Sequence, residues 1–292
     1  MRPAVSSRLT AELFLFGTTF IWASTFVVMK WGLEAYSPLL LLALRFSLAG
    51  GLFVLIFPKI FLSIRRGEFW TGSVLGLLLF LGFALQTEGL LYTTASKSAF
   101  ITGLLVIFTP FVQVVVERRA PTLSNVFGVA IVSVGLWLLT APSGGGLSWG
   151  DALTLLCALA FSIYIVYLDL VSKAHRVLHL TVIQILAVAV FSWIGVFFFE
   201  SPTIKTTPIS LWIVIYLAVA ATMLTGYIQT RYQRDTTPTR AAIIYTVEPV
   251  WAALFAAFTL GERLGSSGIL GGGLIVAGVL ISELSDKKGL SA

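Results

Sequence analysis

The chain is built from apolar runs of about twenty residues that are separated by short polar segments. An α-helix of that length crosses the hydrocarbon core of a bilayer, which is about 30 Å thick. Only 11% of the residues are charged and 58% are hydrophobic, whereas soluble domains carry about 25% charged residues. The pattern therefore predicts an all-α membrane protein without a soluble domain.

Ten such runs fit the sequence, and each predicts one transmembrane helix. They occupy residues 11–31, 38–57, 70–92, 99–116, 123–141, 151–171, 179–199, 211–230, 236–264 and 267–283. A Pro-Ser-Gly-Gly-Gly segment follows the fifth run, and its composition is typical of a flexible linker. We therefore expect a first five-helix unit at 1–141, a linker at 142–149 and a second five-helix unit at 150–292.

The two predicted units resemble one another in sequence. Shifts of 139 and 143 residues pair Trp22 with Phe161, Arg45 with Gln184, Gln86 with Gln229, and Thr93 with Thr236. Because each unit has an odd number of helices, the second unit must enter the membrane from the opposite side. This predicts two inverted five-helix repeats around a central cavity, an arrangement that is common in secondary transporters.

The basic residues gather at one set of helix ends. If the N-terminus is cytoplasmic, the inner segments hold 14 Lys and Arg residues, the outer segments hold 4, and Arg45 lies inside the second run. The positive-inside rule then predicts a multi-pass protein of the cell membrane (inner or plasma membrane) with both termini in the cytoplasm. The net charge of +6 is explained by this placement, so we expect no nucleic-acid partner.

Glu248 is the most unusual residue of the ninth run, because its neighbours are almost all apolar. A carboxylate facing lipid is costly, so Glu248 should face a cavity or a protein partner such as an Arg or a hydroxyl group. Pro249 follows it and predicts a kink. Glu88, near the end of the third run, fits a cavity or the membrane interface equally well. If transport is coupled to protons, Glu248 and Glu88 are the candidate carriers.

Mid-span polar and aromatic side chains, often at repeat-matched positions, predict the substrate site. They are Trp22, Thr25, Gln86, Phe161, Tyr164, Gln229, Tyr245, Glu248 and Trp251. Small-molecule pockets usually combine apolar and aromatic walls with a few placed polar groups. A zwitterionic or amphipathic metabolite therefore fits this set better than an inorganic ion.

Motifs for catalysis, metals or cofactors are not found. The sequence has neither the phosphate-binding pattern G-x-x-x-x-G-K-[ST] nor H-E-x-x-H. His175 and His179 are four residues apart, but no third ligand is evident, as a catalytic zinc site requires. Cys157 is the single cysteine and lies in an apolar run, where we expect it to pack as a small buried residue. We expect no enzyme activity, no metal and no cofactor.

Four passages resemble the drug/metabolite transporter superfamily, in its EamA family of ten-helix transporters. They are Trp22–Phe26, Pro38–Phe46, Gln86–Gly103 and Thr237–Leu264. Glu88 departs from that pattern, in which an apolar or small residue follows Gln-Thr. The resemblance implies a basket of two inverted halves, with a cavity lined mainly by the first, third, fourth, sixth, eighth and ninth helices.

The same resemblance implies a function. Similar proteins export amino acids and other small metabolites, and some import solutes. We therefore expect a secondary transporter, an exporter of a small metabolite such as an amino acid, that works by alternating access as a monomer or weak homodimer. The alternatives are an importer of the same fold and a non-transporting membrane receptor or assembly protein.

Overall fold

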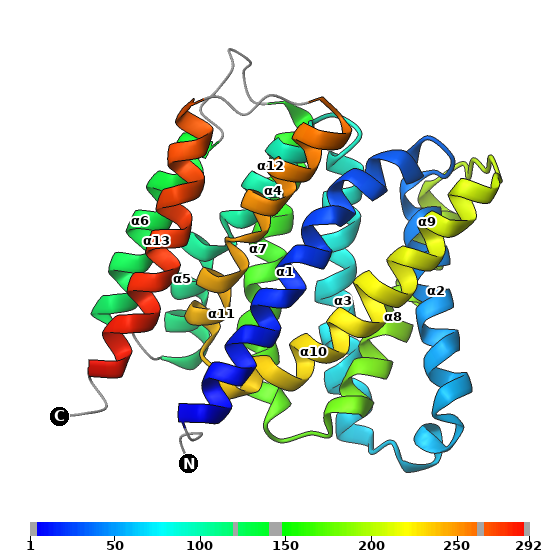
Figure 1. Cartoon of the computed structure of the whole chain (residues 1–292). Coiled ribbons are helices and arrows are strands. Elements are labelled where there is room, and N and C mark those ends of the chain that lie inside the picture. Colours follow the sequence, from blue (N-terminus) through cyan, green and yellow to red (C-terminus); the bar gives the residue numbers. More distant parts are fainter. Residues whose placement is uncertain (1–4, 119–121, 140–147, 262–265, 289–292) are drawn as a thin grey trace.

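The computed structural model describes residues 5–118, 122–139, 148–261 and 266–288, and these residues form a bundle of helices (Figure 1). No β-strand occurs in these ranges, and the only bridge between extended residues there joins Tyr36 to Ile204. The expected division at 142–149 cannot be compared in full, because residues 140–147 lie outside the described ranges.

Five of the helices are continuous and long enough to cross a membrane. They are α1 (Val5–Leu33), α2 (Pro38–Ile56), α3 (Arg66–Gly89), α7 (Trp149–Ser172) and α8 (Val177–Phe199). The short 3-10 helix η1 (Pro58–Ser63) lies between α2 and α3. Capping explains several starts: the Glu200 carboxylate accepts from the amides of Leu39 and Leu40 at 2.9 and 3.0 Å, at the first turn of α2.

Three further spans are each made of two helices in succession. They are α4 (Ala95–Gly103) with α5 (Leu105–Glu117), α9 (Pro208–Ala218) with α10 (Thr225–Tyr232), and α11 (Pro238–Tyr245) with α12 (Glu248–Thr259). The 3-10 helix η3 (Gln233–Asp235) follows α10. The described residues thus contain eight segments that are long and apolar enough to span a membrane.

Two remaining helices, α6 (Leu123–Leu139) and α13 (Ser266–Lys288), pack against each other. Their apolar stretches, Asn125–Leu138 and Ile269–Val279, are shorter than the other eight spans. A Cβ atom at Gly135 would lie 2.8 Å from the carbonyl oxygen of Gly271, so the two backbones approach closely here. Gly271 and Gly278 of α13 therefore lie where α6 and α13 approach each other closely.

Instead of a kink at Pro249, the structure has an interruption between α11 and α12. The helix ends before Pro249, at Thr246 and Val247, and Pro249 lies in the first turn of α12. A proline is well accommodated there, because the amide that it lacks would have no partner within the helix. Another interrupted span begins with α4 at Ala95, where the Thr94 hydroxyl accepts from the Lys97 amide at 3.1 Å.

A π-helical segment, η2 (Val219–Leu224), joins α9 to α10, where a continuous helix was expected. Arg45 of α2, which is only 2% exposed, is hydrogen-bonded to this segment. Its guanidinium donates to Thr222 Oγ1 at 2.5 Å and to the carbonyl of Ala221 at 2.9 Å. The widened turn thus supplies the neutral acceptors that a buried arginine requires.

The first turn of α1 and the last turn of α13 lie on the same side of the bundle, at the bottom of Figure 1. That arrangement agrees with an even number of membrane crossings. Several helix ends carry basic residues: Arg65 before α3, Arg118 after α5, Arg176 before α8 and Arg231 in the last turn of α10.

Candidate substrate-binding cavity

A cavity with an empty volume of about 550 Å³, including the part open to solvent, lies inside the bundle. Its walls come from α1, α2, α3, α4, α5, α7, α10, α11 and α12. Apart from α2, these elements belong to the six spans that the family resemblance indicated.

The structure brings eight of the nine predicted site residues to this cavity. They are Trp22, Thr25, Gln86, Phe161, Tyr164, Gln229, Tyr245 and Glu248. Trp251 is the exception: it does not line the cavity, because α12 leads away after Glu248 and packs along α1. There the Trp251 ring contacts the edge of Phe20, with 5.5 Å between the ring centroids.

Glu88 also lies away from the cavity. It sits in the last turn of α3, half-buried, and accepts a hydrogen bond of 3.4 Å from the Tyr92 hydroxyl. The structure therefore does not bring Glu88 to the cavity, the first of the two positions that the sequence left open.

Six lining residues were not among the predicted set. They are Arg45, Leu79, Phe83, Thr102, Leu105 and Ile165. Arg45 carried a usable signal, since a charged residue deep in an apolar run is functional by default. The apolar members carried none, because a leucine or phenylalanine that lines a cavity has the same local sequence pattern as one that faces lipid.

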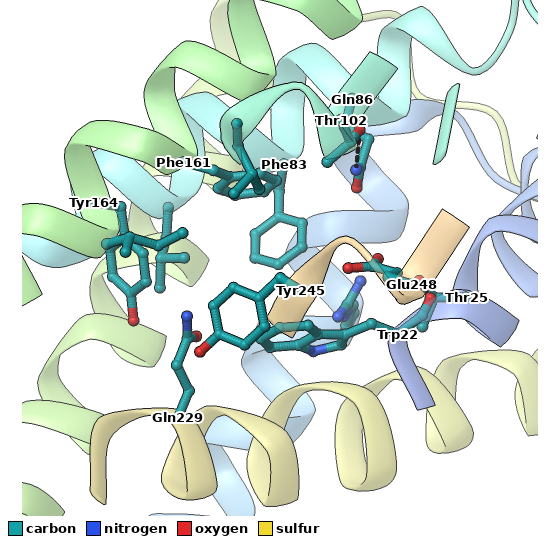
Figure 2. Close-up of a pocket in the computed structure, with 14 residues that line it drawn as sticks. Trp22, Thr25, Phe83, Gln86, Thr102, Phe161, Tyr164, Gln229, Tyr245 and Glu248 are labelled. Carbon is teal, nitrogen blue, oxygen red and sulfur yellow. Dashed lines mark hydrogen bonds between the residues drawn. The ribbon is translucent and has the colours of Figure 1, made fainter. Parts of the chain in front are cut away.

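Aromatic rings meet in pairs around the cavity (Figure 2). Trp22 contacts Tyr245 edge-on, with 5.3 Å between centroids, and Phe83 contacts Phe161 in the same way at 5.2 Å. Gly82 allows the second pair, because any side chain there would collide with the Phe161 ring. The walls therefore present fixed aromatic surfaces that suit an apolar or cationic group.

The polar atoms of these aromatic residues are bound to the protein. Trp22 Nε1 donates to Thr225 Oγ1 at 3.0 Å, and the Tyr245 hydroxyl donates to Gln233 Oε1 at 3.2 Å. The Tyr164 hydroxyl likewise donates to Gln184 Oε1 at 3.1 Å. These hydrogen bonds hold the rings in place, so the rings offer the cavity mainly their apolar surfaces.

Glu248 differs from its polar neighbours. Among the residues that the structure describes, none forms a hydrogen bond or ion pair with its carboxylate, although Glu248 lines the cavity. Gln86, in contrast, donates to Thr102 Oγ1 at 3.0 Å (Figure 2). A carboxylate without a protein partner is available to a ligand or a proton.

Arg45 brings the opposite charge to the same cavity. Besides its two hydrogen bonds to η2, its guanidinium lies over the rings of Phe83 and Phe46, at 4.9 and 5.2 Å from their centroids. No ion pair joins it to Glu248 or to another described acid. The cavity therefore contains one acidic and one basic group that do not neutralise each other by direct contact.

The two histidines form separate contacts near the lower helix ends. His179 Nε2 lies 2.9 Å from Ser63 Oγ, and His175 Nε2 lies 3.4 Å from Thr71 Oγ1. Within the described part of the chain, no three His, Cys, Asp or Glu side chains are grouped as a metal site would require. Cys157 is buried and unpaired in that part of the chain, which agrees with a packing role.

An ion pair between α3 and the loop before α8 lies on the same side. Arg176 Nε and Nη2 donate to the two carboxylate oxygens of Glu68 at 2.7 and 2.6 Å. These hydrogen bonds raise the pKa of the Arg176 guanidinium above its ordinary value. The pair fixes the α7–α8 connection to α3 and lies away from the cavity residues.

Known proteins resemble this chain over nearly its whole length. A transporter of Archaeoglobus fulgidus without an assigned substrate is 34% identical over 278 residues, which cover 95% of this chain and 87% of that protein. The transporter YoaV of Bacillus subtilis, equally uncharacterized, is 25% identical and covers 93% and 96% of the two chains. A solved crystal structure with 18% identity has the same fold, with a TM-score of 0.78 over 96% of this chain and 99% of the other.

The model of the EamA-like transporter family matches the sequence twice, at residues 9–141 and 148–284. The two matches cover every residue that lines the cavity and, except for Arg8, all residues of the candidate membrane spans. The chain therefore belongs to the EamA-like transporter family and is a multi-pass membrane protein.

Proposed function

We propose that the protein is a secondary transporter that exports a small zwitterionic or amphipathic metabolite, such as an amino acid, across the cell membrane. One observation carries this proposal: a cavity inside the bundle combines aromatic walls with an acid and a base that do not pair with each other. Alternating access around a mid-membrane site is the general mechanism of transporters with repeated halves.

The two charged groups suit the two ends of a zwitterion. The Glu248 carboxylate would bind the ammonium group, and Arg45 would attract the carboxylate, since a guanidinium binds carboxylates with good geometry. The rings of Trp22, Tyr245 and Phe161 would surround the apolar part of the solute. An uncharged sugar or an inorganic ion would use few of these features.

Proton coupling through Glu248 extends the same proposal. A carboxyl group that has no protein partner and lines a cavity inside the bundle can bind a proton on one side of the membrane and release it on the other. The competing possibility is that Glu248 stays ionised and only binds the ammonium group.

The Glu248→Gln substitution separates the two possibilities, because it keeps the shape and removes the titrating group. In liposomes with an imposed pH gradient, we expect the variant to lose gradient-driven accumulation of a labelled amino acid and to keep exchange across the membrane. Glu88→Gln, in an acid outside the cavity, is the matched control and should accumulate solute like the unaltered protein.

Three outcomes would change the conclusion. Wild-type flux that ignores the pH gradient would refute proton coupling and indicate facilitated export. Net uptake with the physiological gradients would indicate an importer. Binding of candidate solutes without any flux would favour the alternative of a receptor or assembly protein. Testing a panel of amino acids in the same liposomes would identify the solute.

A further inference from the structure

Two buried carboxylates each bind a threonine and a basic residue from a distant part of the chain. The first is Glu12 of α1, whose Oε1 atom accepts from Arg240 Nε at 2.9 Å and from Thr236 Oγ1 at 3.0 Å. Arg8 also donates to this oxygen, at 3.1 Å. The Glu12 and Arg240 side chains are 6% and 3% exposed, so this α1–α11 ion pair is buried.

The second carboxylate belongs to Asp151 in the first turn of α7. Its Oδ2 atom lies 2.6 Å from Lys97 Nζ of α4, and its Oδ1 atom accepts from Thr93 Oγ1 at 2.8 Å. Asp151 is fully buried, whereas the Lys97 side chain is 37% exposed. Ser148 completes the contacts at the helix start through a capping box with Asp151.

The two ion pairs correspond to each other under the shifts that relate the halves of the sequence. A shift of 139 residues converts Glu12 into Asp151, and a shift of 143 converts Lys97 into Arg240. The second shift also converts Thr93 into Thr236. Each pair therefore joins the first helix of one half to the fourth helix of the other half, with the same combination of acid, base and hydroxyl.

The ion pairs lie at opposite ends of the bundle, because α1 and α7 run in opposite directions (Figure 1). Each acid precedes a cavity residue of its own helix by the same interval. Glu12 lies ten residues before Trp22, and Asp151 lies ten residues before Phe161. At a rise of about 1.5 Å per residue, each acid is about 15 Å from the cavity residue along the helix axis.

The basic residues of the two ion pairs, Lys97 and Arg240, lie on the short helices α4 and α11, which also reach the cavity. Lys97 lies five residues before Thr102 and Arg240 five residues before Tyr245, so α4 and α11 each connect an ion pair to the cavity wall. Both short helices end at a break, beside α5 and α12 respectively. The two breaks lie close together: a Cβ atom added at Gly103, the last residue of α4, would lie 2.9 Å from Pro249 in the first turn of α12.

We propose that the α1–α11 and α4–α7 ion pairs are two gates, one at each end of the cavity, which open one at a time. This inference rests on the transport function proposed above. Both pairs are formed in this structure. Breaking both together would remove a basic partner from two buried carboxylates at the same time, which is more unfavourable than breaking one pair, so rupture of one pair favours retention of the other.

Side-specific labelling tests the gates without any transported solute. The parent protein would carry Cys157→Ala and a reporter cysteine in the cavity, Thr25→Cys, and would be exposed to a membrane-impermeant maleimide from each face of oriented vesicles. We expect Lys97→Gln to raise labelling several-fold from the face that bears the α4–α7 pair. Arg240→Gln should raise it from the opposite face.

Matched controls separate gating from a general loosening of the bundle. Arg231→Gln breaks an ion pair of 2.7 Å with Asp235 that lies within one span, and it should leave the labelling unchanged. The exchanged double variant Glu12→Arg/Arg240→Glu should return labelling toward the parent level. Unchanged labelling in both Lys97→Gln and Arg240→Gln would refute the proposal that the ion pairs are gates. An increase from the same face in both variants would refute it as well.

Crosslinking provides a second test that does not depend on a destabilised variant. In the Cys157→Ala background, Lys97→Cys/Asp151→Cys or Glu12→Cys/Arg240→Cys would be joined by a reducible bis-thiol reagent. We expect either crosslink to stop solute exchange and reduction to restore it, whereas Arg231→Cys/Asp235→Cys should have no effect. Exchange that continues at full rate through both crosslinked proteins would overturn the gates.

The two proposals can fail independently. A protein whose labelling follows the gate variants but that moves no solute would disprove the transport function and retain the ion pairs as conformational switches. A protein that transports solute and shows no change in labelling would disprove the gates and retain the transport function.

Discussion

Individual residues of the cavity divide into those that are held by the protein and those that are available to a ligand. The hydroxyl of Tyr245 and the indole N–H of Trp22 are engaged in hydrogen bonds within the bundle. Glu248 has no such partner among the described residues. We infer that the aromatic residues contribute ring surface, and that Glu248 is the charged group available to a ligand, whereas Arg45 is held by Thr222 and the carbonyl of Ala221.

This division predicts different results for two substitutions of Tyr245. Tyr245→Phe keeps the ring and loses the hydrogen bond to Gln233, so solute affinity should change little. Tyr245→Ala removes the ring and should weaken solute binding by about tenfold, which corresponds to about 1.4 kcal/mol. Trp22→Ala should impair transport in the same way, because Trp22 contacts Tyr245.

Solute exchange at a range of concentrations in liposomes measures this effect. Trp212→Ala is the matched control, because Trp212 lies on the outside of α9 and is 69% exposed. A monodisperse elution profile in detergent would show that each variant is folded. Equal loss of affinity in the Phe and Ala variants would refute the assigned role of the ring.

At the scale of elements, the interrupted helices bring the cavity together. The breaks after α4 and α11 place Thr102 and Glu248 against the same space, and the π-helical segment η2 supplies acceptors for Arg45. Gly103 lies between the two breaks, close to Pro249 and Leu136. Close packing at this position therefore fixes the relative orientation of α4 and α12.

A methyl group at Gly103 should disturb that packing. In Gly103→Ala the new Cβ atom would lie 2.9 Å from Pro249 and 3.2 Å from Leu136, and overpacking of this kind costs about 1–3 kcal/mol. We expect a lower thermal unfolding midpoint of the protein in detergent.

Gly17→Ala is the control for the intrinsic effect of the substitution. A Cβ atom at Gly17 would meet no other atom within 4 Å. Replacing a mid-helix glycine by alanine there should leave the midpoint unchanged or raise it. If Gly103→Ala is as stable as Gly17→Ala, the proposed close packing of the breaks is incorrect.

For the whole molecule, charge and geometry together favour one orientation in the membrane. The start of α1 and the end of α13 lie on the same side (Figure 1), and with ten crossings 14 of the 19 Lys and Arg residues fall on the side of the N-terminus. The positive-inside rule would place this side in the cytoplasm. We propose ten membrane crossings as two inverted five-helix repeats, at 1–141 and 150–292.

Topology reporters fused at Gly145 and at Gly289 test this arrangement. Both positions lie outside the described residues, in the expected linker and near the C-terminus. With five crossings between them, an enzyme reporter that is active only outside the cell should be active at Gly145 and inactive at Gly289. Activity on the same side at both positions would disprove the inverted repeat.

The sequence by itself determined the class of protein and much of the cavity. Run length and the scarcity of charge indicate membrane helices, because the bilayer core accepts few other structures. The placement of polar and aromatic residues within the runs identified eight cavity residues, from Trp22 to Glu248. A polar group in a lipid-spanning segment is costly, so its presence alone indicates an interior or a cavity.

Only the tertiary structure decided how the segments are interrupted and which apolar residues face the cavity. The π-helical segment at Val219–Leu224 depends on Arg45 from another helix, so it has no local signal. Trp251 looked equivalent to the cavity residues in sequence, and Glu88 fitted a cavity or the membrane interface equally well, yet the course of α12 and the end of α3 direct both away from the cavity. Contacts between residues far apart in the chain, such as Glu12 with Arg240, arise from packing and therefore had to be seen in three dimensions.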